Sequence, residues 1–136
     1  MYLHKKVCTK QAVGGKAVGA EATGWFVEPT IYLDVRNDMR LAREEIFGPV
    51  LCVIRFEDES EAIRIANDSD YGLSAGIWSR DISRVHRVAA ALEAGRIVVN
   101  EYSGGFVQTS CGGFKDSGYG REQGSRRLRT TLNSRV

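Results

Sequence analysis

Residues 50–99, VLCVIRFEDESEAIRIANDSDYGLSAGIWSRDISRVHRVAAALEAGRIVV, decide the fold. The run at residues 50–56 is apolar and rich in β-branched side chains, which predicts a strand buried on both faces. Further strands are expected over residues 73–79 and 97–99, and apolar residues recur at helical spacing in the two segments between strands. Strands that alternate with helices in this way favour parallel pairing through crossover helices, so the sequence predicts an α/β fold.

Both expected helices are preceded by residues that can cap them. Asp58 or Ser60 can accept a hydrogen bond from the first turn of the first helix, and Glu61 follows three residues after Asp58. Asp81 occupies the same kind of position before the second helix, which is expected to end at Gly95.

The sequence on either side is less regular. Extended structure is expected around residues 25–35 and a short helix over residues 38–46. Residues 103–120 contain six glycines and almost no periodicity. A loop of this length usually has a function, and it follows a strand end, where α/β sheets place their ligands. The end of the chain predicts a helix over residues 123–131 and the start of a strand over residues 132–136.

The composition excludes several classes of protein. With 136 residues, 43% of them hydrophobic, a net charge of +2 and no membrane-spanning run, the chain is expected to be one soluble domain. No secretory signal is visible, so a cytoplasmic location is expected.

Three scattered cysteines and two isolated histidines argue against a disulfide framework and a metal site. A cluster of arginines is expected to form a solvated helix face and not a nucleic-acid surface. The cluster consists of Arg121, Arg126, Arg127, Arg129 and Arg135.

Two places in the sequence could carry chemistry. Glu45 could accept paired hydrogen bonds from a sugar diol, and Phe47 could pack against a planar base. The alternative is an ion-paired glutamate at a helix end beside a core phenylalanine. Cys111 lies in the glycine-rich stretch and could be a nucleophile if Lys115 or Arg121 activated its thiol; the alternative is a packing residue. The glycines of this stretch do not fit the dinucleotide-binding fingerprint, and a loop that closes a cleft is the better interpretation.

Four segments closely resemble, in order and spacing, the C-terminal part of the NAD(P)-dependent aldehyde dehydrogenases. They are residues 24–30, 44–50, 67–75 and 112–122. The resemblance implies a parallel-sheet, α/β fragment of the family's catalytic domain over residues 1–136, with a C-terminal helix leading to an incomplete oligomerisation strand. Residues 1–13 match poorly, residues from about 129 to 136 begin the oligomerisation segment, and the Rossmann cofactor domain is absent.

The resemblance also implies site residues. Glu45 would accept hydrogen bonds from the nicotinamide ribose of NAD or NADP, and Phe47 would pack near the nicotinamide ring. The loop from Tyr102 to Cys111, which includes Phe106, would form a wall of the aldehyde pocket. Ser110 and Cys111 stand where the family usually has a Pro-Phe pair, which removes an aromatic from the expected pocket wall, so the resemblance does not define the substrate preference. No metal is implied.

In this family a cysteine thiolate attacks the aldehyde, the thiohemiacetal gives hydride to the nicotinamide, and water hydrolyses the thioester. The family's nucleophile and general-base glutamate lie upstream of the matched region. The isolated chain is therefore expected to be inactive, to bind the cofactor weakly or not at all, and to self-associate or pair with a longer relative. Neither nucleic acid nor membrane is an expected partner. The alternative is a non-catalytic remnant that acts as a binding or assembly module.

Overall fold

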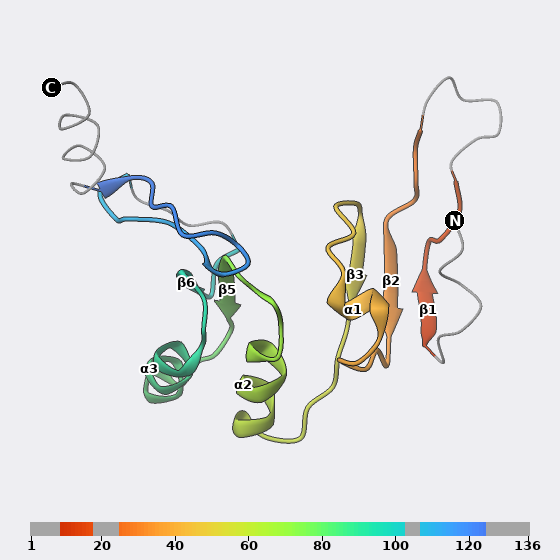
Figure 1. Ribbon diagram of the computed structural model, residues 1–136. Coiled ribbons are helices and arrows are strands. Elements are labelled where there is room, and N and C mark those ends of the chain that lie inside the picture. The colour runs from red at the N-terminus through yellow and green to blue at the C-terminus, as the bar shows by residue number, and fades with distance from the viewer. Residues whose placement is uncertain (1–8, 18–24, 103–106, 125–136) are drawn as a thin grey trace, which may run out of the picture. The chain divides into compact units, whose positions relative to one another are not determined.

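The computed structural model describes residues 9–17, 25–102 and 107–124. It divides into two compact units, Met1–Glu57 and Asp58–Val136, which we call the N-terminal and C-terminal units. In Figure 1 the N-terminal unit runs from red to yellow-green and the C-terminal unit from green to blue. Each unit is described by itself.

Within residues 9–17 and 25–57, the N-terminal unit has a three-stranded sheet and one short helix (Figure 1). Its elements are β1 (Lys10–Val13), β2 (Thr30–Leu33), α1 (Arg40–Arg43) and β3 (Val50–Cys52). The strand order is β1-β2-β3; β2 is antiparallel to β1 and parallel to β3. The expected extended structure and short helix are both present, but the sheet is mixed, because β1 pairs with β2 in antiparallel orientation.

The core of this unit lies between α1 and one face of the sheet. Val35, Met39 and Leu41 are buried there, and strand residues including Val50 and Cys52 pack against them. Successive residues of a strand point to opposite faces, so Leu51 points away from this core and is 58% exposed. The expectation of a strand buried on both faces was wrong for this unit, because the cluster around α1 covers only one face.

The described residues of the C-terminal unit form two helices and four short strands. They are α2 (Glu59–Asn67), β4 (Tyr71–Gly72), β5 (Ser74–Ile77), α3 (Ile82–Ala91), β6 (Arg96–Val99) and β7 (Phe114–Lys115). β5 and β6 are parallel and α3 connects them, as the sequence predicted. β4 and β7 form a separate antiparallel pair. The glycine-rich stretch therefore contains a strand, and the expected parallel arrangement is one part of a mixed α/β structure.

The helix caps agree with the sequence. The Asp58 carboxylate accepts a hydrogen bond from the Glu61 N–H at 2.8 Å, and the Asp81 carboxylate accepts one from the Arg84 N–H at 3.1 Å. α3 ends at Ala91, before Gly95. Gly95 has another role: a β-carbon there would lie 1.6 Å from the Gly112 carbonyl oxygen, so only glycine allows this close approach.

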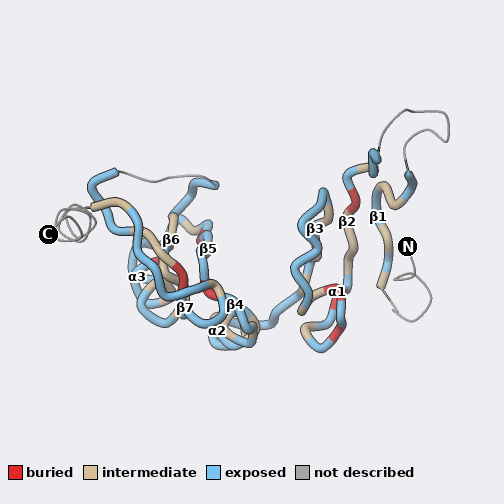
Figure 2. The backbone as a smooth tube through the Cα atoms, turned by 45° about the horizontal axis from the view of Figure 1, so that its top comes forward, coloured by how far each residue is buried: buried red, intermediate tan, exposed pale blue. Residues whose placement is uncertain are grey.

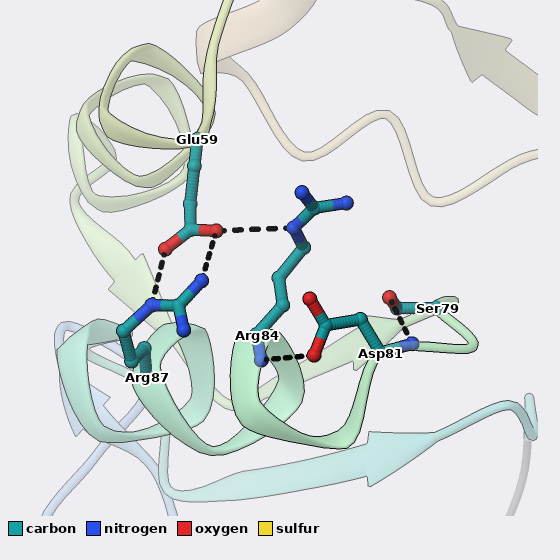
Figure 3. A network of polar contacts seen from close by, with 5 residues as sticks. All are labelled: Glu59, Ser79, Asp81, Arg84 and Arg87. Atoms are coloured by element: carbon teal, nitrogen blue, oxygen red, sulfur yellow. Dashed lines mark hydrogen bonds and ion pairs between the residues drawn. The ribbon is translucent and has the colours of Figure 1, made fainter.

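An ion-pair network joins the two helices of the C-terminal unit. Glu59 of α2 accepts hydrogen bonds from Nε and Nη2 of Arg87 at 3.0 Å and from Nε of Arg84 at 3.1 Å (Figure 3). Both arginines come from α3, beside the Asp81 cap. The guanidinium of Arg87 is the main cause that lowers the pKa of the Glu59 carboxyl.

Buried residues are confined to short stretches of each unit (Figure 2). In the C-terminal unit they include Ile77 at the end of β5 and Val85 of α3. Over the described part of the chain, no helix has the length and apolar character needed to cross a membrane. The expected C-terminal helix and strand lie, apart from Gln123 and Gly124, outside the described residues.

Candidate functional site

The loop between α1 and β3 carries both predicted cofactor residues. Glu45 and Phe47 line one open hollow of about 510 Å³ on the N-terminal unit. Its floor is formed by residues of α1 and β3 that include Leu41 and Val50. The structure therefore places the two predicted residues at the same concave surface.

The two neighbouring glutamates of this loop have different environments. Glu44 forms an ion pair with Arg40, one helical turn earlier. Glu45 is exposed, and no other described residue forms a hydrogen bond or ion pair with its carboxylate. The glutamate that ion-pairs at the helix end is thus Glu44. The Glu45 carboxylate is available to accept hydrogen bonds from a ligand.

Phe47 is not a core residue. Its side chain is 92% exposed, and its backbone has φ of 54°, in the left-handed region. That conformation costs a residue with a β-carbon about 1–2 kcal/mol. Such backbone outliers cluster at ligand sites, where the surrounding structure holds them. Here the Pro49 carbonyl anchors the loop to β2 by accepting a hydrogen bond from the Thr30 N–H at 2.8 Å.

Cys52 also lines this hollow and is structural. Its thiol donates to the Leu41 carbonyl at an S–O distance of 3.6 Å. Burial raises the pKa of the thiol, so it stays protonated and a poor nucleophile at neutral pH.

The predicted pocket residues belong to the C-terminal unit. Tyr102 follows β6 and is 90% exposed, while Cys111 is half-buried. The backbone of Cys111 pairs with that of Glu122 through hydrogen bonds of 2.7 and 2.6 Å. This bridge closes the glycine-rich segment. Phe106 lies outside the described residues, as does Cys8.

Both cations considered as activators of Cys111 bind other groups. Lys115 Nζ donates to the carbonyls of Asn67 at 2.6 Å and Ser69 at 3.0 Å, and forms an ion pair with Glu93 at 2.7 Å. Lys115 therefore binds the segment at the end of α2, where carbonyl groups lack helical partners. A structural role accounts for its charge.

Arg121 is engaged within the glycine-rich segment itself. Its Nη1 donates to the carbonyls of Gly113 at 2.8 Å and Gly120 at 2.9 Å, and its guanidinium lies 5.4 Å from the centre of the Phe114 ring. It is therefore part of a folded loop and not of a solvated helix face. The other arginines of the cluster lie outside the described residues.

Sequence reasoning missed two asparagines. Asn67 donates from Nδ2 to the Ala91 carbonyl at 2.8 Å and accepts at Oδ1 from the Glu93 N–H at 2.9 Å, so it joins the ends of α2 and α3. Asn100 makes an equivalent pair of hydrogen bonds with Ser79. An asparagine at the end of a periodic segment is the available signal, because its amide can replace missing backbone partners.

Comparisons with known proteins all lead to one family. A model described as the aldehyde dehydrogenase family matches residues 3–136. An aldehyde dehydrogenase of Emericella nidulans is 46% identical over 121 residues, which are 89% of this chain and 24% of the relative. A betaine aldehyde dehydrogenase of Brucella anthropi is 52% identical over 101 residues, 74% of this chain and 21% of the relative. The chain thus spans about a quarter of the length of these relatives or slightly less.

Solved structures show the same relationship. An aldehyde dehydrogenase from Pseudomonas aeruginosa is 50% identical with a TM-score of 0.85, over 89% of this chain and 24% of that one. An indole-3-acetaldehyde dehydrogenase of P. syringae, solved as a mutant in complex with NAD+, is 47% identical with a TM-score of 0.85 over the same shares. The match over nearly the whole sequence and the shared fold establish one conclusion: the chain belongs to the aldehyde dehydrogenase family.

Proposed function

We propose that this chain forms the C-terminal part of the catalytic domain of an NAD(P)-dependent aldehyde dehydrogenase, a cytoplasmic enzyme that oxidises aldehydes to carboxylic acids. One observation carries the proposal: Glu45 and Phe47, the residues assigned to the cofactor, lie on one hollow with an unpaired carboxylate and an exposed ring. Relatives solved with NAD+ support this cofactor class.

In this proposal the two residues bind and orient the cofactor, which supplies the acceptor for a hydride. The Glu45 carboxylate accepts hydrogen bonds from the two ribose hydroxyls beside the nicotinamide. Phe47 packs near the nicotinamide ring, and its left-handed backbone holds the phenyl group out of the core. Tyr102, Phe106 and Cys111 contribute to the wall that contacts the aldehyde.

We further propose that these 136 residues by themselves do not oxidise aldehydes. The family's nucleophilic cysteine and general base are assigned upstream of the matched region. Of the described thiols, Cys52 is held protonated by burial, and the cations closest in sequence to Cys111 are engaged elsewhere. The purified chain, mixed with NAD+ and a series of aldehydes, is expected to produce no NADH. NADH formation that is lost on replacing Cys52 or Cys111 would contradict this.

The cofactor assignment is tested in a chimaera in which this chain replaces the matching quarter of the P. aeruginosa aldehyde dehydrogenase. E45Q is expected to raise KM for NAD+ about tenfold, because it removes a charge-assisted hydrogen bond. E44Q is the matched control, since the neighbouring carboxylate is engaged by Arg40. Equal KM values for the two variants would refute the role of Glu45. A chimaera without aldehyde-dependent NADH formation would refute the proposed function.

A further inference from the structure

The chain changes direction at Asn100, directly after β6. Its N–H donates to the Ile77 carbonyl at 2.8 Å, so the pairing of β6 with β5 continues to this residue. Its φ is 52°, in the left-handed region. Among residues other than glycine, asparagine adopts this conformation most readily. Asn100 therefore sets the direction in which the backbone leaves the sheet toward Tyr102.

The side chain of Asn100 extends the pairing beyond the turn. Its Oδ1 accepts a hydrogen bond from the Ser79 N–H at 2.9 Å, and its Nδ2 donates to the Ser79 carbonyl at 3.0 Å. One amide thus satisfies both backbone groups of Ser79, as the next residue of a strand would. The backbone can turn away while the amide takes its place in the ladder.

Ser79 is in turn fixed to the start of α3. Its hydroxyl accepts a hydrogen bond from the Asp81 N–H at 3.1 Å, and the Asp81 carboxylate caps α3 through the Arg84 N–H (Figure 3). Asn100 is consequently anchored to a helix whose first turn is itself fixed. Ser79 therefore links the end of β6 to the start of α3.

We propose that Asn100 is the positioning residue for the wall of the aldehyde pocket, acting through its paired hydrogen bonds with Ser79. The inference rests on the proposed function, in which Tyr102, two residues further on, contacts the substrate. Asn100 performs two tasks here. The Asn100 backbone adopts the left-handed turn, and the side-chain amide presents one acceptor to the N–H and one donor to the carbonyl of Ser79. Without the amide, the backbone after β6 is no longer held by Ser79, so the position of Tyr102 is no longer fixed. The hollow around Glu45 is expected to stay unchanged.

The anchor is tested first in the 136-residue chain by amide hydrogen exchange. N100A is expected to speed exchange of the Ser79 amide about tenfold, because that amide loses its acceptor. The Val85 amide in α3 reports general loosening and should change little. E101Q is the matched control, since Glu101 is the next residue, is exposed, and has no hydrogen bond or ion pair with another described residue. Unchanged exchange at position 79 in N100A, or equal acceleration at Val85, would overturn the anchor.

The role in positioning is tested in the chimaera described above. N100A and N100D are expected to raise KM for the aldehyde about tenfold while KM for NAD+ stays within about twofold. N100D places a second acceptor against the Ser79 carbonyl, so it loses one bond and adds repulsion. E101Q should leave both constants near the unmutated values. A parallel rise of both KM values, or effects equal to those of E101Q, would overturn the inference. An inactive unmutated chimaera would instead refute the proposed function and leave the exchange result to decide the anchor.

Discussion

At the residue scale, Phe47 combines an exposed ring with a backbone conformation that its β-carbon disfavours. Replacing it by glycine relieves the strain, whereas alanine keeps the β-carbon and loses the ring. We expect F47G to be about 0.5–1 kcal/mol more stable to urea than F47A, after allowance for the greater freedom of glycine in the unfolded chain. Both variants should lose the contact proposed for the cofactor. Greater stability of F47A would show that the left-handed conformation carries no cost.

Glu59 is the residue at which stability is expected to depend on pH. Hydrogen bonds from Arg87, and then from Arg84, lower the pKa of its carboxyl in the folded chain. A lowered folded pKa contributes stability that is present above the unfolded pKa and lost as pH falls through the folded pKa. We expect E59Q to lower Tm at neutral pH, with the difference from wild type closing in acid.

The matched control for this prediction is E61Q. Glu61 lies on the same helix and carries the same charge. The distance from its Oε1 to Arg64 Nη2 is 3.5 Å, longer than the 3.0 Å from Glu59 Oε2 to Arg87 Nη2. The effect of E59Q should also shrink at high salt, because the groups are exposed and screening acts on them. A difference in Tm between E59Q and wild type that stays constant from neutral pH to acid would contradict the role of this ion pair.

At the element scale, the start of α2 depends on one of two residues that the sequence allows as a cap. The structure selects Asp58, whose carboxylate accepts from the Glu61 N–H. D58A is expected to cost about 1 kcal/mol of unfolding free energy, because that N–H loses its acceptor. S60A is the control, since Ser60 lies inside the first turn. Chemical denaturation measures the unfolding free energy of both variants. A larger loss of unfolding free energy in S60A than in D58A would contradict the assignment of Asp58 as the cap.

The strands differ in how far the sequence could predict them. The parallel pair β5–β6 was predictable because an amphipathic helix separates two apolar runs. β7 was not predictable, because a strand of two residues inside a glycine-rich stretch shows no alternation of apolar and polar side chains. Its existence depends on pairing with Tyr71 and Gly72, more than forty residues earlier in the chain. Close approaches such as that of Gly95 to Gly112 make this pairing possible.

At the scale of the whole molecule, large apolar side chains are exposed on both units. Trp25 and Phe47 are examples on the N-terminal unit, and Tyr102 and Tyr119 on the C-terminal unit. Because exposed apolar surface favours association, we expect the isolated chain to self-associate. Size-exclusion chromatography with light scattering should show a mass that rises with concentration, and W25S should reduce the rise. A single monomeric mass over the whole range would contradict this prediction.

Pairing of the chain with a longer relative remains a prediction, as do the pocket roles of Tyr102, Phe106 and Cys111. Co-purification of this chain with a tagged full-length aldehyde dehydrogenase would test the pairing.

The sequence by itself determined the α/β class, the two capped helices, the parallel connection through α3 and the resemblance to the aldehyde dehydrogenases. These properties depend on local spacing and on motifs that are read along the chain. Only the tertiary structure decided that Glu44 is paired while Glu45 is not, and that Asn100 replaces a strand residue opposite Ser79. The physical reason is that ion pairing, burial and hydrogen bonding depend on how the folded chain orients neighbouring side chains, as for Arg40 and Glu44, and on which distant segments it brings together, as for Ser79 and Asn100.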